Sequence, residues 1–121
     1  MTISVLAVDD SRTMRDMITL ALQDNDFEVH LAEDGQQGLE VLATVAADVI
    51  ITDINMPRLD GFGFIGAVRD QPESRHTPIL VLTTESSPEL KARARDAGAT
   101  GWIVKPFAQD KLIRALRMVA G

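Results

Sequence analysis

The chain has 121 residues, 45% of them hydrophobic and 25% charged, which suits one ordinary globular domain spanning residues 1–121. It contains no cysteine, so disulfides, thiolate metal sites and cysteine catalysis are excluded. The net charge of −6 argues against binding to nucleic-acid phosphates. The chain has no basic signal-peptide start and no run of about 20 apolar residues, so a cytoplasmic location without a membrane span is expected.

Strand-like apolar runs alternate with helical patterns along the chain. Strands are predicted at residues 3–8, 27–31, 48–53, 79–83 and 101–104, and helices at 12–22, 35–46, about 62–69, 88–97 and about 107–120. Ser11 and Ser87 are predicted N-caps, the latter followed by a proline, and Gly98 should end the fourth helix. Helical spacing predicts that the first and last helices bury Met14, Met17, Ile18, Ala21, Leu22, Leu112, Leu116 and Val119.

This alternation predicts an α/β fold with parallel strands and helices on both faces of the sheet. The first, third and fourth strands are continuously apolar and should be central. The second strand alternates, with Phe27, Val29 and Leu31 on one face and polar residues on the other, which is typical of an edge. These features fit a doubly wound sheet in the order 2-1-3-4-5, whose ligand crevice lies between strands 1 and 3.

Polar residues stand where four of these strands end. Asp9 and Asp10 follow the first strand, Asp53 the third, Thr83 the fourth and Lys105 the fifth. The carboxyl ends of parallel strands share one edge, so these side chains should converge. Two unit charges about 4 Å apart repel by about 4 kcal/mol at an effective dielectric of about 20, so three acids there call for a cation. All-oxygen ligands favour Mg²⁺.

An ammonium, a hydroxyl and Mg²⁺ around one carboxylate form a set suited to phosphoryl transfer, with Asp53 as nucleophile and Thr83 and Lys105 assisting. Each residue alone has a plainer explanation, since Asp is common in caps and turns and Lys on surfaces. Complementary residues at all four strand ends favour the functional interpretation.

The motifs resemble those of response-regulator receiver domains, above all the single-domain CheY-like chemotaxis group with its flavodoxin/CheY-like fold. The resemblance covers the whole chain, through residues 8–15, 52–61, 82–85, 98–99 and 105–107, including Asp9-Asp10, Thr52-Asp53 and Lys105-Pro106-Phe107. It implies Asp53 as phosphoacceptor in a two-component phosphorelay and a cis Lys105–Pro106 bond. Such a domain is not a conventional enzyme, but catalyses its own aspartyl phosphorylation and dephosphorylation.

The resemblance also implies residue roles. Asp10, Asp53 and the backbone carbonyl of Asn55 would bind Mg²⁺, with Asp9 acting through water. Thr83 and Trp102 would form the switch, and Asn55, Thr84 and Glu85 would tune dephosphorylation. Two positions depart from the family pattern. Thr84 replaces a small residue, and Trp102 replaces Tyr or Phe, which puts a simple inward rotation of that aromatic in question.

Partners implied by the resemblance are a histidine kinase or phosphotransfer domain and the flagellar motor switch, with the protein a monomer that controls flagellar rotation. A phosphorelay intermediate or phosphate sink is the alternative. A DNA-binding regulator is less favoured because the last helix ends at the chain terminus.

Residues 61–66 match G-x-G-x-x-G, but that dinucleotide motif should directly follow a strand. An FMN site would need a hydroxyl-rich loop in place of Asp9-Asp10, and His30 and His76 look like surface residues.

Overall fold

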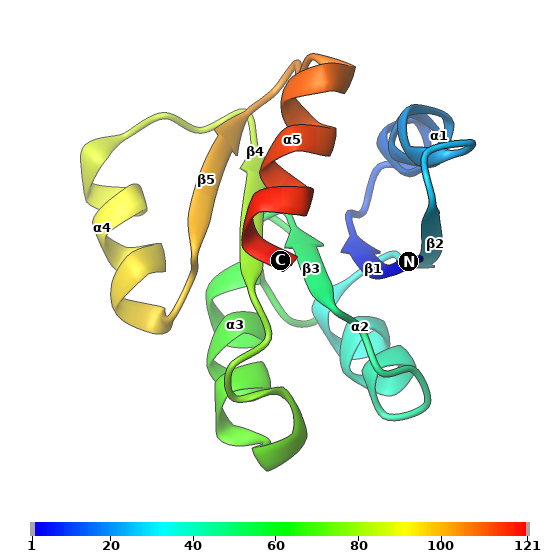
Figure 1. The fold of residues 1–121 in the computed structure, drawn as a ribbon. Helices are drawn as coiled ribbons and strands as arrows, with labels where there is room; N and C mark the ends of the chain where they lie inside the picture. The colour runs from blue at the N-terminus through cyan, green and yellow to red at the C-terminus, as the bar shows by residue number, and fades with distance from the viewer. Residues whose placement is uncertain (1, 121) are drawn as a thin grey trace.

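The computed structural model describes residues 2–120 as a single five-stranded sheet with surrounding helices (Figure 1). The strands are β1 (Ile3–Val8), β2 (Phe27–Ala32), β3 (Val49–Thr52), β4 (Ile79–Thr83) and β5 (Gly101–Val104). The helices are α1 (Arg12–Leu22), α2 (Gly35–Leu42), α3 (Gly61–Asp70), α4 (Pro88–Ala97) and α5 (Gln109–Ala120), with a short 3-10 helix η1 (Pro72–Ser74).

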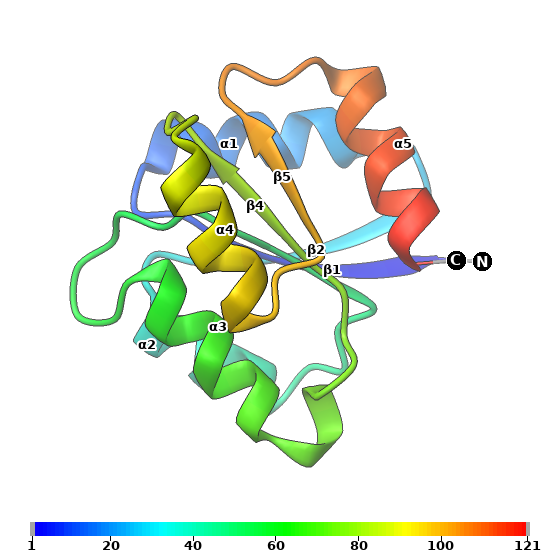
Figure 2. The same ribbon diagram turned by 90° about the vertical axis from the view of Figure 1, so that its left-hand side faces the viewer.

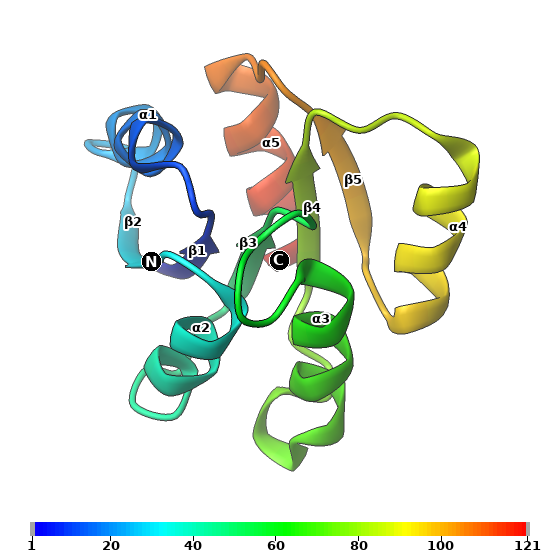
Figure 3. The ribbon, with the colours of Figure 1, turned by 180° about the vertical axis from the view of Figure 1, so that it is seen from behind.

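All neighbouring strands are parallel, and their order is β2-β1-β3-β4-β5, as Figure 3 shows from left to right. The doubly wound fold predicted from the sequence is therefore confirmed. The pairing of β1 with β3 sets Val8 opposite Thr52. The residues that follow, Asp9 and Asp53, therefore leave the sheet side by side.

Helices cover both faces of the sheet. Figure 2 shows α1 and α5 on one face and α2, α3 and α4 on the other. The first face packs against a core that includes Val5, Ile51 and Leu82, and the second against a core that includes Leu6, Ile50 and Phe64. Both cores share the central strands, and every residue of β3 and β4 is buried. Continuous apolar runs in the sequence thus correspond to strands covered on both sides.

Local hydrogen bonds set several helix ends as predicted. The Ser11 side chain accepts a bond from the Met14 amide, and the Ser87 side chain accepts one from the Leu90 amide. Gly98 ends α4 with a φ of 117°, in the left-handed region where glycine carries no Cβ penalty.

Two predicted helix boundaries were wrong. The helix predicted at 35–46 ends at Leu42, because the chain must turn to bring Asp48 beside β1, where the Asp48 amide bonds the Ser4 carbonyl. The helix predicted from residue 107 begins at Gln109. The Leu112 amide bonds the Ala108 carbonyl, so Phe107 and Ala108 precede the helix and belong to the connection from β5.

Side-chain burial also differs from prediction at the margins. Met17 was expected to be buried but is 40% exposed, and Val119 is only half-buried; Leu31, placed on the apolar face of its strand, is 37% exposed. Leu31 lies on the edge strand β2. Met17 lies in the middle of α1, at the edge of the helix face that is buried. Periodicity identifies an apolar face but not how much of it a neighbour covers. Within residues 2–120, no helix is long and apolar enough to cross a membrane.

Candidate acidic site at the carboxyl ends of the strands

Asp9 and Asp53 form the floor of the site, each directly after a buried strand. The Asp53 amide donates to the Val8 carbonyl at 3.0 Å, which continues the β1–β3 pairing by one step. Asp9 is 1% exposed and Asp53 is 8% exposed. Isolated carboxylates at such depth are costly, so their partners decide whether they are charged.

Lys105 supplies the balancing charge from the end of β5. Its Nζ donates to Asp9 Oδ2 at 2.7 Å and to Asp53 Oδ2 at 2.8 Å. The Lys105 amide also donates to the Thr83 carbonyl at 2.7 Å, which aligns the ends of β4 and β5. The Lys105–Pro106 bond is cis, as the resemblance implied. The predicted convergence of Asp9, Asp53 and Lys105 is therefore present.

Backbone donors hold the other carboxylate oxygens. Asp9 Oδ1 accepts from the Ser11 amide at 2.9 Å, and Asp53 Oδ1 accepts from the Ile54 amide at 2.7 Å. Arg15 Nη1 donates to the Asp9 carbonyl at 2.7 Å. Both carboxylates are thus oriented from their own loops as well as by Lys105.

Burial and charge act in opposite directions on these groups. Burial raises the pKa of Asp9 because it disfavours the carboxylate, and this outweighs the lowering by Lys105 and the Ser11 amide. Burial by itself would lower the pKa of Lys105, but its hydrogen bonds to Asp53 and Asp9 outweigh burial and raise it. The ammonium is therefore firmly held in its charged form.

Asp10 completes a cluster with the chemistry of a metal site. It is exposed, and one carboxylate oxygen from each of Asp9, Asp10 and Asp53 lies within 4.8 Å of the others. Three hard oxygen donors, one of them open to solvent, fit Mg²⁺, which keeps several waters and binds through one or two carboxylates. The residues present therefore suit the predicted ion.

Thr83 and Trp102, the predicted switch pair, are connected through a third residue. The Glu85 amide donates to Thr83 Oγ1 at 3.3 Å, and Trp102 Nε1 donates to the Glu85 carbonyl at 3.0 Å. The Thr83 side chain is fully buried, whereas Trp102 is half-buried against the core on the α4 side of the sheet. The indole N–H of Trp can make this bond, whereas a Phe ring cannot, because it carries no hydrogen-bond donor.

The remaining predicted residues follow shortly after the strand ends of β3 and β4. Asn55 and Thr84 are exposed and Glu85 is half-buried.

Gly61 was not among the predicted site residues. A side chain there would collide with the backbone of Asp53 and Ile54, so the close approach of α3 to the site requires glycine.

Sequence reasoning missed another contact beside the site. Arg58 pairs with Asp34, 24 positions away in the sequence, and no local pattern predicts such a pair.

The G-x-G-x-x-G match lies inside α3 and forms no phosphate loop after a strand. His30 pairs with Glu28 and is half-buried, and His76 is exposed, so His30 is less superficial than predicted.

Comparison with known proteins decides the family. The family model described as the response regulator receiver domain matches residues 5–117. The chain belongs to this family. The receiver-domain resemblance seen in the sequence is thereby confirmed over nearly the whole chain.

Chemotaxis proteins are among the relatives of this receiver domain. It is 36% identical over 120 residues to the probable chemotaxis protein CheY of Rhizobium etli, covering 98% of this chain and 93% of that protein. The structure of the chemotaxis response regulator CheY4 of Vibrio cholerae matches with a TM-score of 0.92 and 48% identity, covering 98% of this chain and 99% of the other.

Other relatives have different contexts. The chain is 36% identical over 117 residues to the response regulator MprA of Mycolicibacterium vanbaalenii, covering 97% of this chain but only 50% of that protein. The receiver domain of sensor histidine kinase PA1611 from Pseudomonas aeruginosa matches with a TM-score of 0.92 and 27% identity, covering 100% and 99% of the two chains. That structure holds a magnesium ion in its active-site cleft.

Proposed function

We propose that this receiver domain accepts a phosphoryl group on Asp53 from a phosphohistidine of a histidine kinase or phosphotransfer domain. The observation that carries the proposal is the Asp53 carboxylate at a strand end, 2.8 Å from the Lys105 ammonium and clustered with Asp9 and Asp10. The carboxylate attacks phosphorus in line, the phosphorus–nitrogen bond breaks, and the donor imidazole leaves with that electron pair.

Each side chain has a defined task in this reaction. Lys105 neutralises charge on the transferring group. Thr83 ends β4, the strand that pairs with β3, and its hydroxyl would donate to a phosphoryl oxygen. Asp10, Asp53 and the Asn55 carbonyl would hold Mg²⁺, with Asp9 acting through water. When bound, the ion offsets negative charge on the phosphoryl oxygens and so makes attack by an anion feasible. Asn55, Thr84 and Glu85 set access of water and hence the lifetime of the phosphoryl group.

Labelling with acetyl phosphate tests the phosphoacceptor. Intact chain incubated with acetyl phosphate and Mg²⁺ should gain one phosphoryl group on Asp53, located by mass spectrometry. EDTA should prevent labelling, and Asp53→Asn should abolish it. Label on another residue, or full labelling in EDTA, contradicts the assignment.

The proposed output is chemotaxis signalling to the flagellar motor switch, which the CheY relatives support. The alternative is a phosphorelay or phosphate-sink role, which the non-chemotaxis relatives support.

Phosphorylation would draw the Thr83 hydroxyl away from the Glu85 amide and so disturb the Glu85–Trp102 bond. The target surface is a groove of about 220 Å³ lined by residues including Lys91, Arg95 and Trp102. Lys111 of α5 lies on the other side of β5, in a second hollow that Trp102 also lines. The basic rim of the groove suits an acidic amphipathic segment.

Trp102 is the sole tryptophan, so its fluorescence reports on this switch. Beryllofluoride with Mg²⁺, a stand-in for the phosphoryl group, should change the emission, and Thr83→Ala should reduce the change. Unchanged emission and unchanged α4 and β5 chemical shifts, with Asp53 fully occupied, would favour the phosphate sink.

A further inference from the structure

The loop between β3 and α3, residues 53–60, carries both Asp53 and the proposed metal ligand Asn55. Its base is fixed against α3. The Gly61 amide donates to the Ile54 carbonyl at 2.9 Å, and the backbones approach so closely that Gly61 admits no Cβ. Ile54 itself is 2% exposed in the core. The beginning of the loop therefore has little freedom to move.

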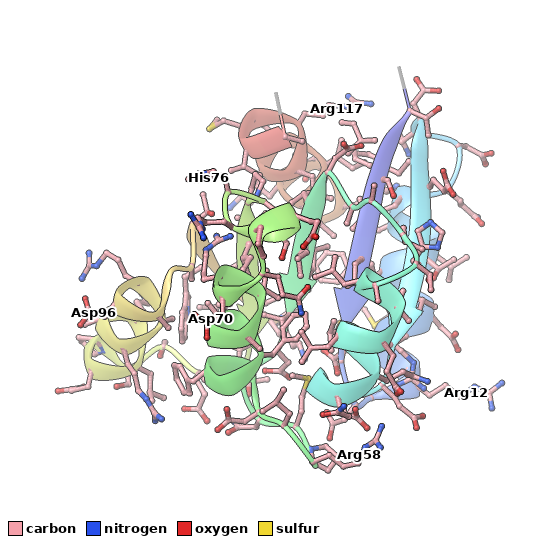
Figure 4. The ribbon with its side chains drawn as sticks, turned by 90° about the horizontal axis from the view of Figure 1, so that it is seen from below. Arg12, Arg58, Asp70, His76, Asp96 and Arg117 are labelled. Atoms are coloured by element: carbon pink, nitrogen blue, oxygen red, sulfur yellow. The ribbon has the colours of Figure 1, made fainter. Side chains whose placement is uncertain are left out.

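The far end of the loop is fixed separately, against the start of α2. Figure 4 labels Arg58 on this loop, beside α2. Arg58 Nε donates to Asp34 Oδ2 at 2.8 Å and Nη2 donates to Asp34 Oδ1 at 3.1 Å, a two-pronged ion pair. The next carbonyl, of Leu59, accepts from the Gly35 amide at 3.1 Å. Arg58 and Leu59 of the loop thus hold Asp34 and Gly35, the N-cap and first residue of α2.

Asp34 is a rigid anchor for this pair. It is 4% exposed and is the N-cap of α2, where Oδ1 also accepts from the Gln37 amide at 2.8 Å. The Arg58 bond and the Gln37 amide lower the pKa of Asp34, so the carboxylate is charged at neutral pH. The carboxylate is thus held by the start of α2 as well as by Arg58, whose own side chain is 56% exposed.

The Arg58 backbone is in an unfavourable conformation. Its φ is 67°, in the left-handed region that costs a side chain free energy and that glycine or asparagine adopts more readily. Such a conformation persists only where surrounding contacts enforce it. Here those contacts are the bond from the Leu59 amide to the Pro57 carbonyl at 2.8 Å, which closes the turn at Arg58, together with the Asp34 pair and the Leu59–Gly35 bond.

We propose that the Arg58–Asp34 pair is a positioning device for the metal site, because it holds residues 55–57 and with them the Asn55 carbonyl. Asn55 lies between the two fixed ends of the loop, three residues before Arg58. Arg58 itself acts through the loop backbone. The inference rests on the proposed function, since it assigns that carbonyl to Mg²⁺.

The variant Arg58→Asn separates positioning from simple electrostatics. Removing a positive charge from the protein should by itself favour Mg²⁺ binding, whereas losing the anchor should weaken it. Asparagine also tolerates the left-handed backbone. We expect Mg²⁺ binding by the intact chain, measured by calorimetry and by amide chemical shifts at Asp10 and Ile54, to weaken by about tenfold. Arg75→Asn removes an equal charge from the exposed loop after η1 and should leave the affinity unchanged.

A second variant tests the partner. Asp34→Ser keeps a good N-cap for α2 but removes the carboxylate, and should weaken Mg²⁺ binding to a similar extent. The double variant should be no weaker than either single one, because both remove one interaction. Arg58→Lys should restore part of the affinity.

The outcomes are distinct. Arg58→Asn binding Mg²⁺ as tightly as the parent or more tightly, with its amide spectrum otherwise preserved, overturns the positioning role while leaving the phosphoacceptor role intact. Additive losses in the double variant also overturn it, since the two residues would then act independently. A parent chain that binds no Mg²⁺ overturns both proposals.

Discussion

At the scale of single residues, the site gathers negative charge that folding alone does not favour. Asp9, Asp10 and Asp53 share a small volume, and Lys105 bonds two of them but not Asp10. The arrangement favours binding of a cation at the expense of folding stability, which is common at functional sites. The three carboxylates should therefore lower the stability of the metal-free protein.

Asp10→Asn should raise the free energy of unfolding, because it removes one repelling charge without breaking a hydrogen bond in the structure. The gain is expected to be about 1 kcal/mol in EDTA, since solvent screens the exposed Asp10. Urea unfolding in EDTA measures it. In saturating Mg²⁺ the parent should gain more stability than the variant, by linkage. A variant less stable than the parent in EDTA would show that repulsion is not the dominant effect.

The Asp34 carboxyl should make stability depend on pH. Its pKa is lowered in the folded protein by Arg58 and then by the Gln37 amide, so the folded state binds its proton less readily than the unfolded state. The stabilisation is present above the unfolded pKa of about 3.9 and is lost as pH falls through the lower folded pKa. Urea unfolding of parent and Asp34→Asn should differ most between about pH 5 and 7 and converge in stronger acid. A difference that grows in acid would contradict this sign.

At the scale of elements, α4 is fastened to α3 at two places. The Arg93 guanidinium lies 4.0 Å from the centre of the Phe62 ring, a cation–π contact. Arg69 Nε and Nη2 donate to the Gly98 carbonyl at 3.1 and 2.8 Å, at the end of α4. The helix proposed to carry the output is therefore held by side chains of its neighbour as well as by the sheet.

Arg69→Met should loosen the end of α4. Arg69 Nη1 also donates to the carbonyls of Ser74, Arg75 and Thr77, so the change leaves several part-buried acceptors without a donor. We expect a loss of about 2–3 kcal/mol in the free energy of unfolding, and faster hydrogen exchange at the amides of Thr77 and Ala99.

Arg75→Met is the matched control for Arg69. Its side chain is exposed, and the change should alter stability by no more than about 0.5 kcal/mol. Equal effects of the two substitutions would mean that the carbonyl contacts of Arg69 contribute little to holding α4.

At the scale of the whole molecule, the sequence predicted what local chemistry controls. Buried β-branched runs identified the central strands, and Ser11, Ser87 and Gly98 identified helix ends, because each acts through bonds within a few residues. Parallel topology then placed Asp9, Asp53 and Lys105 together without any knowledge of contacts. The metal and phosphoryl roles of these residues, and the cytoplasmic location and monomeric state, stay predictions.

Features fixed by distant contacts were not predictable in this way. The Arg58–Asp34 pair and the bonds from Arg69 to Gly98 join residues 24 and 29 positions apart, with no repeating pattern to reveal them. The end of α2 was misplaced because residues 43–46 carry no strong helix stop, and the turn is imposed by the start of β3. Exposure of Met17 and Leu31 likewise depends on which neighbours are absent at the margins of the sheet.

The early end of α2 has a practical consequence for protein engineering. Ala43 and Thr44 form an exposed turn before β3, whereas Asp53 follows β3, so the strand separates them by about 13 Å. Exposed turns of this kind tolerate added sequence. A flexible segment of about ten residues inserted between Ala43 and Thr44 should leave Asp53 labelling by acetyl phosphate within about twofold of the parent. The same segment between Pro57 and Arg58 should abolish labelling. The first position therefore offers an internal attachment point for a fluorescent reporter that leaves both the reactive edge and the α4–β5 surface uncovered.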